Sequence, residues 1–376
     1  MTDFDLVIAG GGPVGLVTAI AARQRGLSAV VIERNAELPE KACGEGLMPG
    51  AVTVLDALGV SLRDGVAFRG IRFVDGARVA AAEFPQQSGR AVARRQLMLA
   101  LAARARAVGV EVWAGHTLRD FHYRERVLSA EVSGAGRVRT LRGQLLVAAD
   151  GLRSGIRRRL DYELPPRRPQ RFGLQRHYRC SPWTDWVEVH WHDRAEAYVT
   201  PLGAGEVGVA LLCHGAPAPY DELLRSFPAL ERSLAGVEPP GRVRGAGPFE
   251  QRTRAVLAPG VALVGDAAGY LDAVSGEGLA LGFRAAVALV DRFASGELWR
   301  YPNDHARLCS THHAITWLML EIARRPQLRR SIIQFLGAHP ALFSDLLGIA
   351  ADARVPARSW LGSTLRWALS RLVLAS

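Results

Sequence analysis

The sequence contains a single lysine, Lys41, so arginine carries almost all of its positive charge. The formal net charge of +11 is spread along the chain. Tails that bind nucleic-acid phosphates usually concentrate like charges in blocks. We therefore expect no nucleic-acid partner, and the arginine bias has no direct bearing on function.

Cysteine is also scarce, with four residues at positions 43, 180, 213 and 309 that form no CxxC pair and no Cys/His metal spacing. Free thiols in a reducing cytoplasm fit this usage, and we expect no metal. The first residues do not form a charged segment followed by an apolar one, as a secretory leader does. No apolar run approaches the ~20 residues of a membrane-spanning helix. We expect a cytoplasmic protein.

A glycine-rich turn follows the first apolar run. Residues 6–9 are apolar, 10–15 read Gly-Gly-Gly-Pro-Val-Gly, and 16–25 have helical composition. Strand, glycine turn and helix in this order are typical of a dinucleotide site, because free N–H groups at the helix start hold phosphate. A second strand over 28–32 ends in Glu33, at roughly the 20-residue spacing from which a carboxylate reaches the ribose. This pattern alone does not distinguish NAD from FAD.

Two more apolar strands end in an aspartate. Residues 145–149 lead into Asp150-Gly151, with a helix expected from Ser154. Residues 261–264 lead into Gly265-Asp266, and a long helix is expected from about Gly276 to 293. In open α/β folds, ligands bind at the carboxyl ends of the strands. The three motifs therefore predict a single site at one sheet edge.

The intervening segments predict further structure. A helix is expected over 94–108, and strands over 110–114, 119–133 and 137–141. Alternating polar and apolar residues over 172–213 predict a separate antiparallel sheet that forms the wall of a substrate site. Residues after 301 have helical composition.

In this order, and without a second glycine fingerprint, the three motifs resemble those of the FAD-dependent oxidoreductases of the para-hydroxybenzoate-hydroxylase-like superfamily. The resemblance implies FAD as cofactor and NAD(P)H as electron donor. The fold class that it implies is α/β + β: a discontinuous Rossmann-like FAD-binding domain with an antiparallel-sheet substrate domain and a C-terminal helical segment. The expected boundaries are 1–75, 91–165 and 250–300 for FAD binding, 76–90 and 166–249 for substrate binding, and 301–376 for the helices.

The resemblance also assigns roles to residues. Glycines 10, 12 and 15 are expected at the pyrophosphate, Glu33 at the adenosine ribose and Asp266 at the ribityl chain, with the amides of Gly278 and Leu279 facing the flavin. Arg94 resembles the family arginine that reaches FAD. The predicted cofactor-binding residues are Gly10, Gly12, Pro13, Val14, Gly15, Glu33, Arg34, Cys43, Gly44, Arg94, Asp150, Gly151, Ser154, Gly265, Asp266, Gly276, Gly278 and Leu279.

The loop Lys41-Ala42-Cys43-Gly44-Glu45-Gly46-Leu47 is similar to that of the geranylgeranyl-reductase-like branch, and related loops occur in flavin hydroxylases. In that branch the cysteine lies beside the flavin. Cys43 is thus a candidate catalytic residue, as proton donor or polariser, or else a small buried thiol. Many relatives have proline where this chain has Ala273. The tryptophans at 183, 186 and 191 do not form the WxWxIP motif of flavin halogenases, so halogenation is not expected.

Three functions follow from the resemblance. The leading one is an NAD(P)H-using monooxygenase that hydroxylates an aromatic, polyketide-like or lipophilic metabolite through a C4a-hydroperoxyflavin. The alternative is a reductase of carbon–carbon double bonds, and the third is a non-catalytic FAD-containing binding protein. The expected partner is a small-molecule substrate, and the oligomeric state is left open.

Side chains outside the three motifs support weaker expectations. Residues 359–374 predict an amphipathic helix, either packed on the protein or in peripheral contact with a membrane. In the predicted sheet, Arg176 and Tyr178 are candidates for orienting a substrate. His190 and His192 share a strand face, where hydrogen-bonded histidines are more common than metal ligands.

Overall fold

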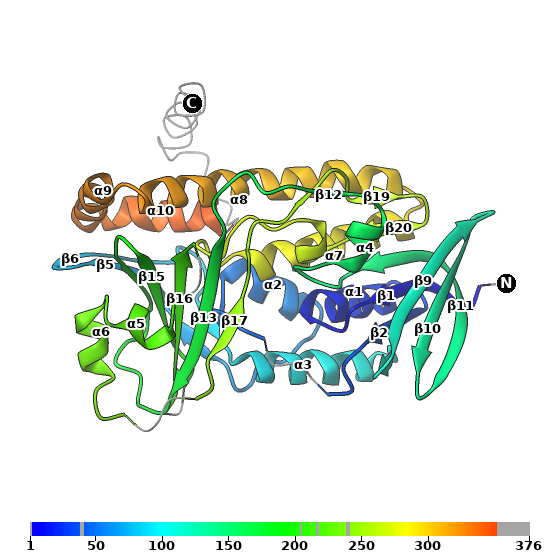
Figure 1. The fold of residues 1–376 in the computed structure, drawn as a ribbon, viewed down its shortest axis with the longest axis horizontal. Helices are drawn as coiled ribbons and strands as arrows, with labels where there is room; N and C mark the ends of the chain where they lie inside the picture. The colour runs from blue at the N-terminus through cyan, green and yellow to red at the C-terminus, as the bar shows by residue number, and fades with distance from the viewer. Residues whose placement is uncertain (1, 38–40, 204, 216–217, 238–240, 352–376) are drawn as a thin grey trace.

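The computed structural model describes residues 2–37, 41–203, 205–215, 218–237 and 241–351. The amphipathic helix predicted over 359–374 lies outside the described residues. Two sheets lie at opposite ends of the molecule, and the long helix α8 (Tyr301–Ala323) runs along both of them (Figure 1). The predicted fold class is confirmed.

The first sheet is built on parallel strands in the order β20-β11-β1-β2-β8. Strand β1 is apolar without alternation because both faces of the sheet are covered, and Leu6, Val7 and Ile8 are fully buried. Helix α1 packs against α3 and α7. These elements are β1 (Phe4–Ala9), β2 (Ala29–Glu33), β8 (Glu111–Ala114), β11 (Arg137–Ala148), β20 (Val261–Leu263), α1 (Pro13–Gln24), α3 (Arg94–Ala107) and α7 (Gly278–Ala294).

An antiparallel extension lies on the side of the N-terminus (Figure 1). It consists of β9 (Thr117–Arg124), β10 (Val127–Gly134) and the first half of β11. The strand predicted over 119–133 is therefore two strands, which turn at Glu125 and Arg126 with positive φ angles of 50° and 63°. The turn contains no Gly, Pro, Asn or Asp, which are the usual sequence signals. The segments predicted separately around 137–141 and 145–149 form one continuous strand.

The second sheet has seven strands in the order β17-β13-β16-β15-β14-β5-β6. Its members are β5 (Gly70–Asp75), β6 (Arg78–Glu83), β13 (Arg171–Tyr178), β14 (Val187–Trp191), β15 (Ala195–Pro201), β16 (Val207–His214) and β17 (Arg244–Ala246). The predicted boundary at 75 assigned β5 to the first domain, but β5 pairs with β14 in this sheet. The local sequence pattern predicts that these residues form a strand, but it does not show which distant strand pairs with them. The division into domains otherwise stays a prediction.

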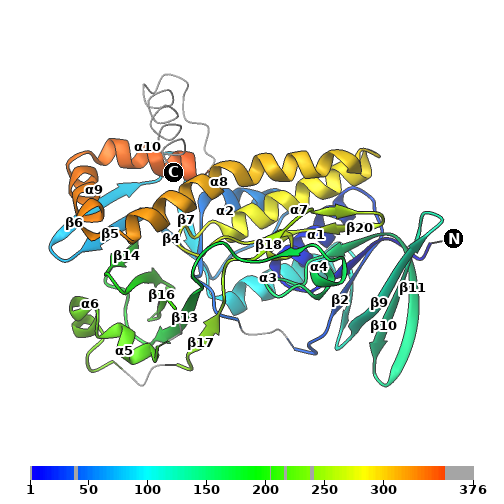
Figure 2. The ribbon, with the colours of Figure 1, turned by 45° about the horizontal axis from the view of Figure 1, so that its top comes forward.

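Helices cover both faces of the second sheet. The short helices α5 (Tyr220–Leu224) and α6 (Pro228–Ser233) pack on one face, and α9 (Pro326–Ala338) and α10 (Pro340–Ala350) pack near β5 and β6 (Figure 2). The predicted C-terminal helical segment is thus confirmed as far as Ala350. Within the described ranges, no single helix has the length and apolarity to cross a bilayer; α9 and α10 reach them only together, bent by 108°.

Small elements connect the two sheets. A three-stranded sheet and helix α2 follow the loop around Cys43, and α4 follows Asp150. Short segments after β20 bring the chain to α7. These elements are β3 (Gly46–Leu47), β4 (Val66–Phe68), β7 (Gly89–Ala91), α2 (Pro49–Ala57), α4 (Gly155–Arg159), β12 (Glu163–Leu164), β18 (Arg252–Thr253), β19 (Leu257–Ala258), the 3-10 helix η1 (Gly265–Ala268) and the 3-10 helix η2 (Leu298–Arg300).

Candidate active site

The three predicted motifs meet at one edge of the parallel sheet. Ala9 at the end of β1 is in register with Ile32 on β2 and with Ala148 on β11, and Ala148 is in register with Leu263 on β20. Because these strands are parallel, the segments that follow them emerge side by side. The predicted convergence of the glycine turn, Glu33, Asp150 and Asp266 is therefore confirmed as an arrangement.

Close packing explains two of the three fingerprint glycines. Gly10 has a φ of +111°, and a Cβ there would lie 2.4 Å from the carbonyl oxygen of Ala149. A Cβ on Gly15 would lie 1.9 Å from the carbonyl oxygen of Gly10. A Cβ on Gly12 would meet no described atom within 4 Å, although Gly12 is the N-cap of α1. The helix start therefore presents its free N–H groups to open space.

The carboxylate of Glu33 closes onto this turn. Its Oε2 accepts a hydrogen bond from the backbone N–H of Gly11 at 2.8 Å, and its Oε1 accepts one from the N–H of Asn35 at 2.9 Å. Oε1 also accepts a hydrogen bond from Asn35 Nδ2 at 2.5 Å, so only Oε2 keeps a lone pair for a further donor. Glu33 thus shapes the turn, and its predicted contact with a ribose stays a prediction.

Asp150 lies two residues beyond the end of β11, and one of its carboxylate oxygens has no hydrogen-bond partner among the described residues. Its Oδ2 accepts from the backbone N–H of Ile156 at 3.2 Å, while its buried Oδ1 has no hydrogen-bond partner among the described residues. Ser154 caps α4, because its hydroxyl accepts from the N–H of Arg157 at 2.9 Å. A buried carboxylate oxygen without a hydrogen-bond donor costs free energy, so Asp150 Oδ1 is a candidate acceptor for a donor group of a bound ligand.

Arg157 holds the site together and was missed by sequence reasoning. Its side chain is fully buried and donates to the carbonyl oxygens of Asp266 and Ala267 at 3.2 Å each, to that of Leu152 at 3.0 Å, and to Gln251 Oε1 at 2.7 Å. It therefore connects the segment after β11 to the segment after β20. Only burial distinguishes it from its neighbours in the run Arg157-Arg158-Arg159.

The segments after β20 lie close to α1 and to the cavity described below. Gly265 begins η1, and a Cβ there would lie 3.0 Å from Val14 Cγ2. Burial raises the pKa of the Asp266 carboxyl, although the Arg94 guanidinium lowers it. Gly278 begins α7, where a Cβ would lie 3.0 Å from the ring of Tyr270.

Arg94 and the loop of Cys43 form the next part of the site. Arg94 is the first residue of α3; its backbone N–H donates to Glu45 Oε1 at 2.8 Å, and its buried Nε has no hydrogen-bond partner within the described part of the chain. The backbone N–H of Glu45 donates to Cys43 Sγ at 3.4 Å. Burial raises the pKa of the Cys43 thiol, although nearby Arg94 lowers it. The thiol is therefore protonated at neutral pH.

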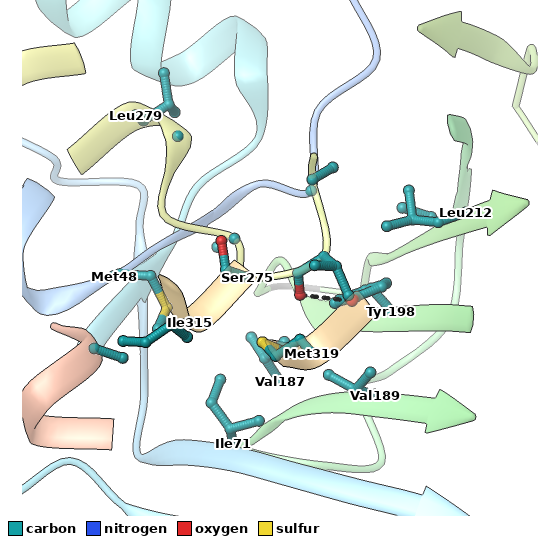
Figure 3. A pocket seen from close by; sticks show the side chains of 18 of the residues that line it. Met48, Ile71, Val187, Val189, Tyr198, Leu212, Ser275, Leu279, Ile315 and Met319 are labelled. Atoms are coloured by element: carbon teal, nitrogen blue, oxygen red, sulfur yellow. Dashed lines mark hydrogen bonds between the residues drawn. The ribbon is translucent and has the colours of Figure 1, made fainter. Parts of the chain in front are cut away.

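One large cavity, of about 1380 Å³, joins these residues to the second sheet. Cys43, Arg94, Asp266, Gly278 and Leu279 line it together with apolar side chains. Figure 3 shows side chains that point into it, including Met48 from the start of α2, Ile71 from β5, Val187 and Val189 from β14, Leu212 from β16, and Ile315 and Met319 from α8. The hydroxyl of Tyr198 is turned to the carbonyl oxygen of Val274, at 2.7 Å. Most of the wall is thus apolar.

The structure places the four candidate side chains of the second sheet outside the cavity or in contacts of their own. Arg176 and Tyr178 do not line this cavity: Arg176 pairs with Asp221 at 2.7 Å on the opposite face of the sheet, and Tyr178 packs with α5 and α6. Their strand has the opposite face toward the cavity, so Gln175 lines it instead. His190 contacts Glu188 at 3.0 Å, and His192 lies beyond the end of β14. Within the described residues, no group of three or more potential metal ligands comes together.

The site fits an extended dinucleotide with a flat redox-active ring. Buried Arg94 Nε and Asp150 Oδ1 each lack a partner among the described residues, and the start of α1 is open at Gly12. A donor, an acceptor and an anion-binding helix start therefore lie along one sheet edge that leads into the cavity.

Comparison with known proteins agrees with this geometry. The model of the family described as FAD binding domain matches residues 3–194. The chain belongs to this family, and it is an enzyme of the FAD-dependent oxidoreductase type. The resemblance drawn from the sequence is thereby confirmed, including its geranylgeranyl-reductase-like neighbours.

Three curated relatives cover most of the chain. The menaquinone reductase of Mycolicibacterium smegmatis is 30% identical over 362 residues, covering 89% of this chain and 86% of that protein. A putative 2-heptyl-3-hydroxy-4(1H)-quinolone synthase of Rhodococcus erythropolis is 28% identical, with 90% and 93% covered. Digeranylgeranylglycerophospholipid reductase 1 of Methanopyrus kandleri is 29% identical, with 74% and 76% covered.

Solved structures share the fold at lower identity. A flavoprotein/dehydrogenase from Cytophaga hutchinsonii has a TM-score of 0.80 at 19% identity, covering 92% of each chain. A geranylgeranyl bacteriochlorophyll reductase-like protein from Thermoplasma acidophilum has a TM-score of 0.77 at 19% identity, covering 96% of this chain and 98% of that one. A flavoprotein/dehydrogenase and a reductase-like protein thus share this chain's architecture, which does not by itself determine the reaction.

Proposed function

We propose that the chain is an FAD-dependent monooxygenase that hydroxylates the ring of a lipophilic substrate, with NAD(P)H as electron donor. The observation that carries the proposal is the large cavity, because residues predicted to lie at the flavin, among them Arg94, Asp266 and Gly278, line it together with an apolar wall. Its volume of about 1380 Å³ exceeds the roughly 300–1,000 Å³ of an ordinary ligand pocket. Such a space suits a flavin ring together with an elongated substrate.

The residues of the sheet edge would hold the cofactor. The N–H groups at the start of α1 beside Gly12 would bind its phosphates, Arg94 Nε would donate to it, and Asp150 Oδ1 would accept from it. The amides at the start of α7, at Gly278 and Leu279, would stabilise negative charge on the reduced ring. When bound, FAD supplies hydride acceptance and activation of dioxygen.

The cavity wall indicates the substrate class. Its apolar side chains come from strands β5, β14 and β16 of the second sheet and from helices α8 and α10, so they can surround an apolar chain. A menaquinone and a heptylquinolone both combine a ring with an apolar chain, and proteins named for them are relatives of this one. We infer a ring-bearing lipid as substrate, with its ring toward Glu45 and Arg94.

A base inside the cavity favours hydroxylation. Glu45 lines the cavity, and its carboxylate can accept the proton of a ring hydroxyl, which makes the ring richer in electrons. Burying such a carboxylate requires hydrogen bonds, and Arg94, Gln175 and His177 supply them.

Product analysis tests the proposal. The yellow holoprotein, NADPH, ¹⁸O₂ and a long-chain alkylphenol are incubated, and the product is analysed by mass spectrometry. We expect one ¹⁸O atom in the product for each NADPH consumed. A product without ¹⁸O, or one that gains two hydrogen atoms instead, overturns hydroxylation.

Reduction of a carbon–carbon double bond is the second candidate. The specific observation in its favour is the position of the Cys43 thiol in the cavity wall, where burial raises its pKa, because saturation of a double bond needs a proton as well as a hydride. In that case, activity on a prenylated quinone persists without oxygen. Cys43→Ala then loses the activity while retaining FAD, with Cys180→Ala, two residues beyond the end of β13, as control.

A further inference from the structure

Three side chains connect the cavity to the protein surface. His177 on β13 lies between two carboxylates: its Nε2 is 2.6 Å from Glu45 Oε2, and its Nδ1 is 2.8 Å from Glu206 Oε1. The side chain of Glu45 is 3% exposed and lines the cavity, whereas that of Glu206 is 39% exposed. The side chains thus run from the interior to solvent.

The backbone around Glu45 is built to hold its carboxylate in this position. Glu45 has a φ of 60°, which is uncommon for a residue with a side chain. Its carbonyl oxygen accepts from the N–H of Val92 at 2.9 Å, and Gln175 Nε2 donates to its Oε2 at 3.1 Å. Gly208 faces it from β16, where a Cβ would lie 3.1 Å from Oε2. A larger residue there would crowd the carboxylate.

The geometry requires a proton that the three groups share. A neutral imidazole donates from only one ring nitrogen. Both ring nitrogens of His177 lie within hydrogen-bond distance of a carboxylate oxygen. Either the imidazole is protonated on both nitrogens, or one of the two glutamates carries the proton. The two states differ only by movement of that proton along a short hydrogen bond.

We propose that Glu45, His177 and Glu206 form a proton relay that exchanges the hydroxyl proton of the substrate with solvent while the cavity is filled. This inference rests on the proposed function. The relay starts with the shared proton on Glu45 and the imidazole protonated at Nδ1. Glu45 passes its proton to His177 Nε2 as the Nδ1 proton moves to Glu206, and the ionised Glu45 carboxylate then takes the proton of the substrate O–H bond, which breaks. Glu206 then releases a proton to water. No electrons move, and the half-buried ring regains its first tautomer by exchange with water.

The charged groups near His177 determine the pKa of its imidazole. Glu45 faces it from the Cys43 loop and Glu206 from the turn before β16, while the carbonyl oxygen of His177 accepts from the N–H of Gly241. Arg244 on β17 is in register with Gln175, two residues before His177. Burial lowers the pKa of the imidazole, but the two carboxylates outweigh it and raise the pKa above its ordinary value.

The first test needs no turnover. The His177 resonance of ¹⁵N-histidine-labelled holoprotein is assigned by its loss in His177→Gln and titrated by NMR. We expect Glu45→Gln and Glu206→Gln each to lower the pKa of His177 by about one unit, because each removes a neighbouring negative charge. Glu222→Gln, an exposed change on α5, is the control and leaves it unchanged. An unshifted pKa in both relay variants overturns the connection, whether or not the protein hydroxylates.

The second test separates a relay from a structural clamp. His177→Gln keeps a donor for Glu45 but cannot pass a proton. We expect kcat on the alkylphenol to fall about 100-fold, within the range of general acid–base catalysis, while KM and FAD content stay near those of wild type. Added imidazole restores turnover to His177→Ala. Wild-type kcat in His177→Gln, or no rescue by imidazole, overturns the relay and leaves ¹⁸O incorporation by wild type as separate support for hydroxylation.

Discussion

Replacement of Arg157 by methionine tests how the candidate site is held together. The buried guanidinium donates to three backbone carbonyl oxygens, those of Leu152, Asp266 and Ala267, and to the Gln251 side chain. Methionine is of similar length and fills part of the space, but it leaves these acceptors without their donor. An unsatisfied buried polar group costs about 1–3 kcal/mol. Because some acceptors will find other donors or water, we expect a loss of about 3–5 kcal/mol in the free energy of unfolding.

The assay is urea unfolding of the apoprotein followed by tryptophan fluorescence, with FAD affinity measured on the same samples. The matched control is Arg158→Met, one residue along the same helix but exposed, and we expect it to stay within about 0.5 kcal/mol of wild type. Because Arg157 also fixes the backbone of Asp266, FAD affinity falls in Arg157→Met and not in the control. Equal unfolding midpoints for the two variants contradict this account of the site.

Three further predictions use other parts of the structure. In the glycine turn, Gly15→Ala is expected to abolish FAD uptake, because its Cβ would lie 1.9 Å from the Gly10 carbonyl oxygen. Gly12→Ala is expected to keep a free energy of unfolding within about 1 kcal/mol of wild type and only to weaken FAD binding. Equal stability of the two variants in thermal unfolding refutes the packing argument. The pKa values of His305 and His312 on α8, lowered by burial from the ordinary 6.5 to about 4, imply that the unfolded chain binds protons that the folded chain does not. Stability should therefore be full above pH 6.5 and fall as the pH drops toward 4, and His305→Leu should flatten this fall in urea midpoints; an unchanged slope contradicts the assignment. Tyr301→Phe removes the buried bond to the Leu263 carbonyl oxygen, 2.8 Å long, and should cost about 1–2 kcal/mol by the same unfolding measurement; no loss would show that water replaces the hydroxyl.

The sequence predicted the sheet edge well because its signals are local. The strand β1, the last residues of β11 and the strand β20 are short apolar runs that are followed within two residues by glycine or aspartate, and parallel pairing brings such ends together. The helix over Arg94–Ala107 was predicted from its spacing of apolar residues. These features need no knowledge of distant partners.

The features that sequence reasoning missed depend on contacts between distant segments. Strand β5 pairs with β14 across more than a hundred residues, so its local pattern could not show which sheet it joins. Arg157 differs from Arg158 only in burial, and Glu45 meets His177 only after β13 folds over the Cys43 loop. The cavity wall depends in the same way on α8 and α10, whose composition gives no sign of what they cover.

Binding of a homologous series of alkylphenols to the holoprotein tests the central claim most directly, because that claim places the flavin and an apolar chain in one cavity. Perturbation of the flavin absorbance reports each dissociation constant. At about 0.8 kcal/mol for each buried CH₂ group, we expect the constant to fall about fourfold with each added methylene until the cavity is filled. A dissociation constant that does not change with chain length, or a flavin spectrum that does not respond to any member of the series, contradicts the claim.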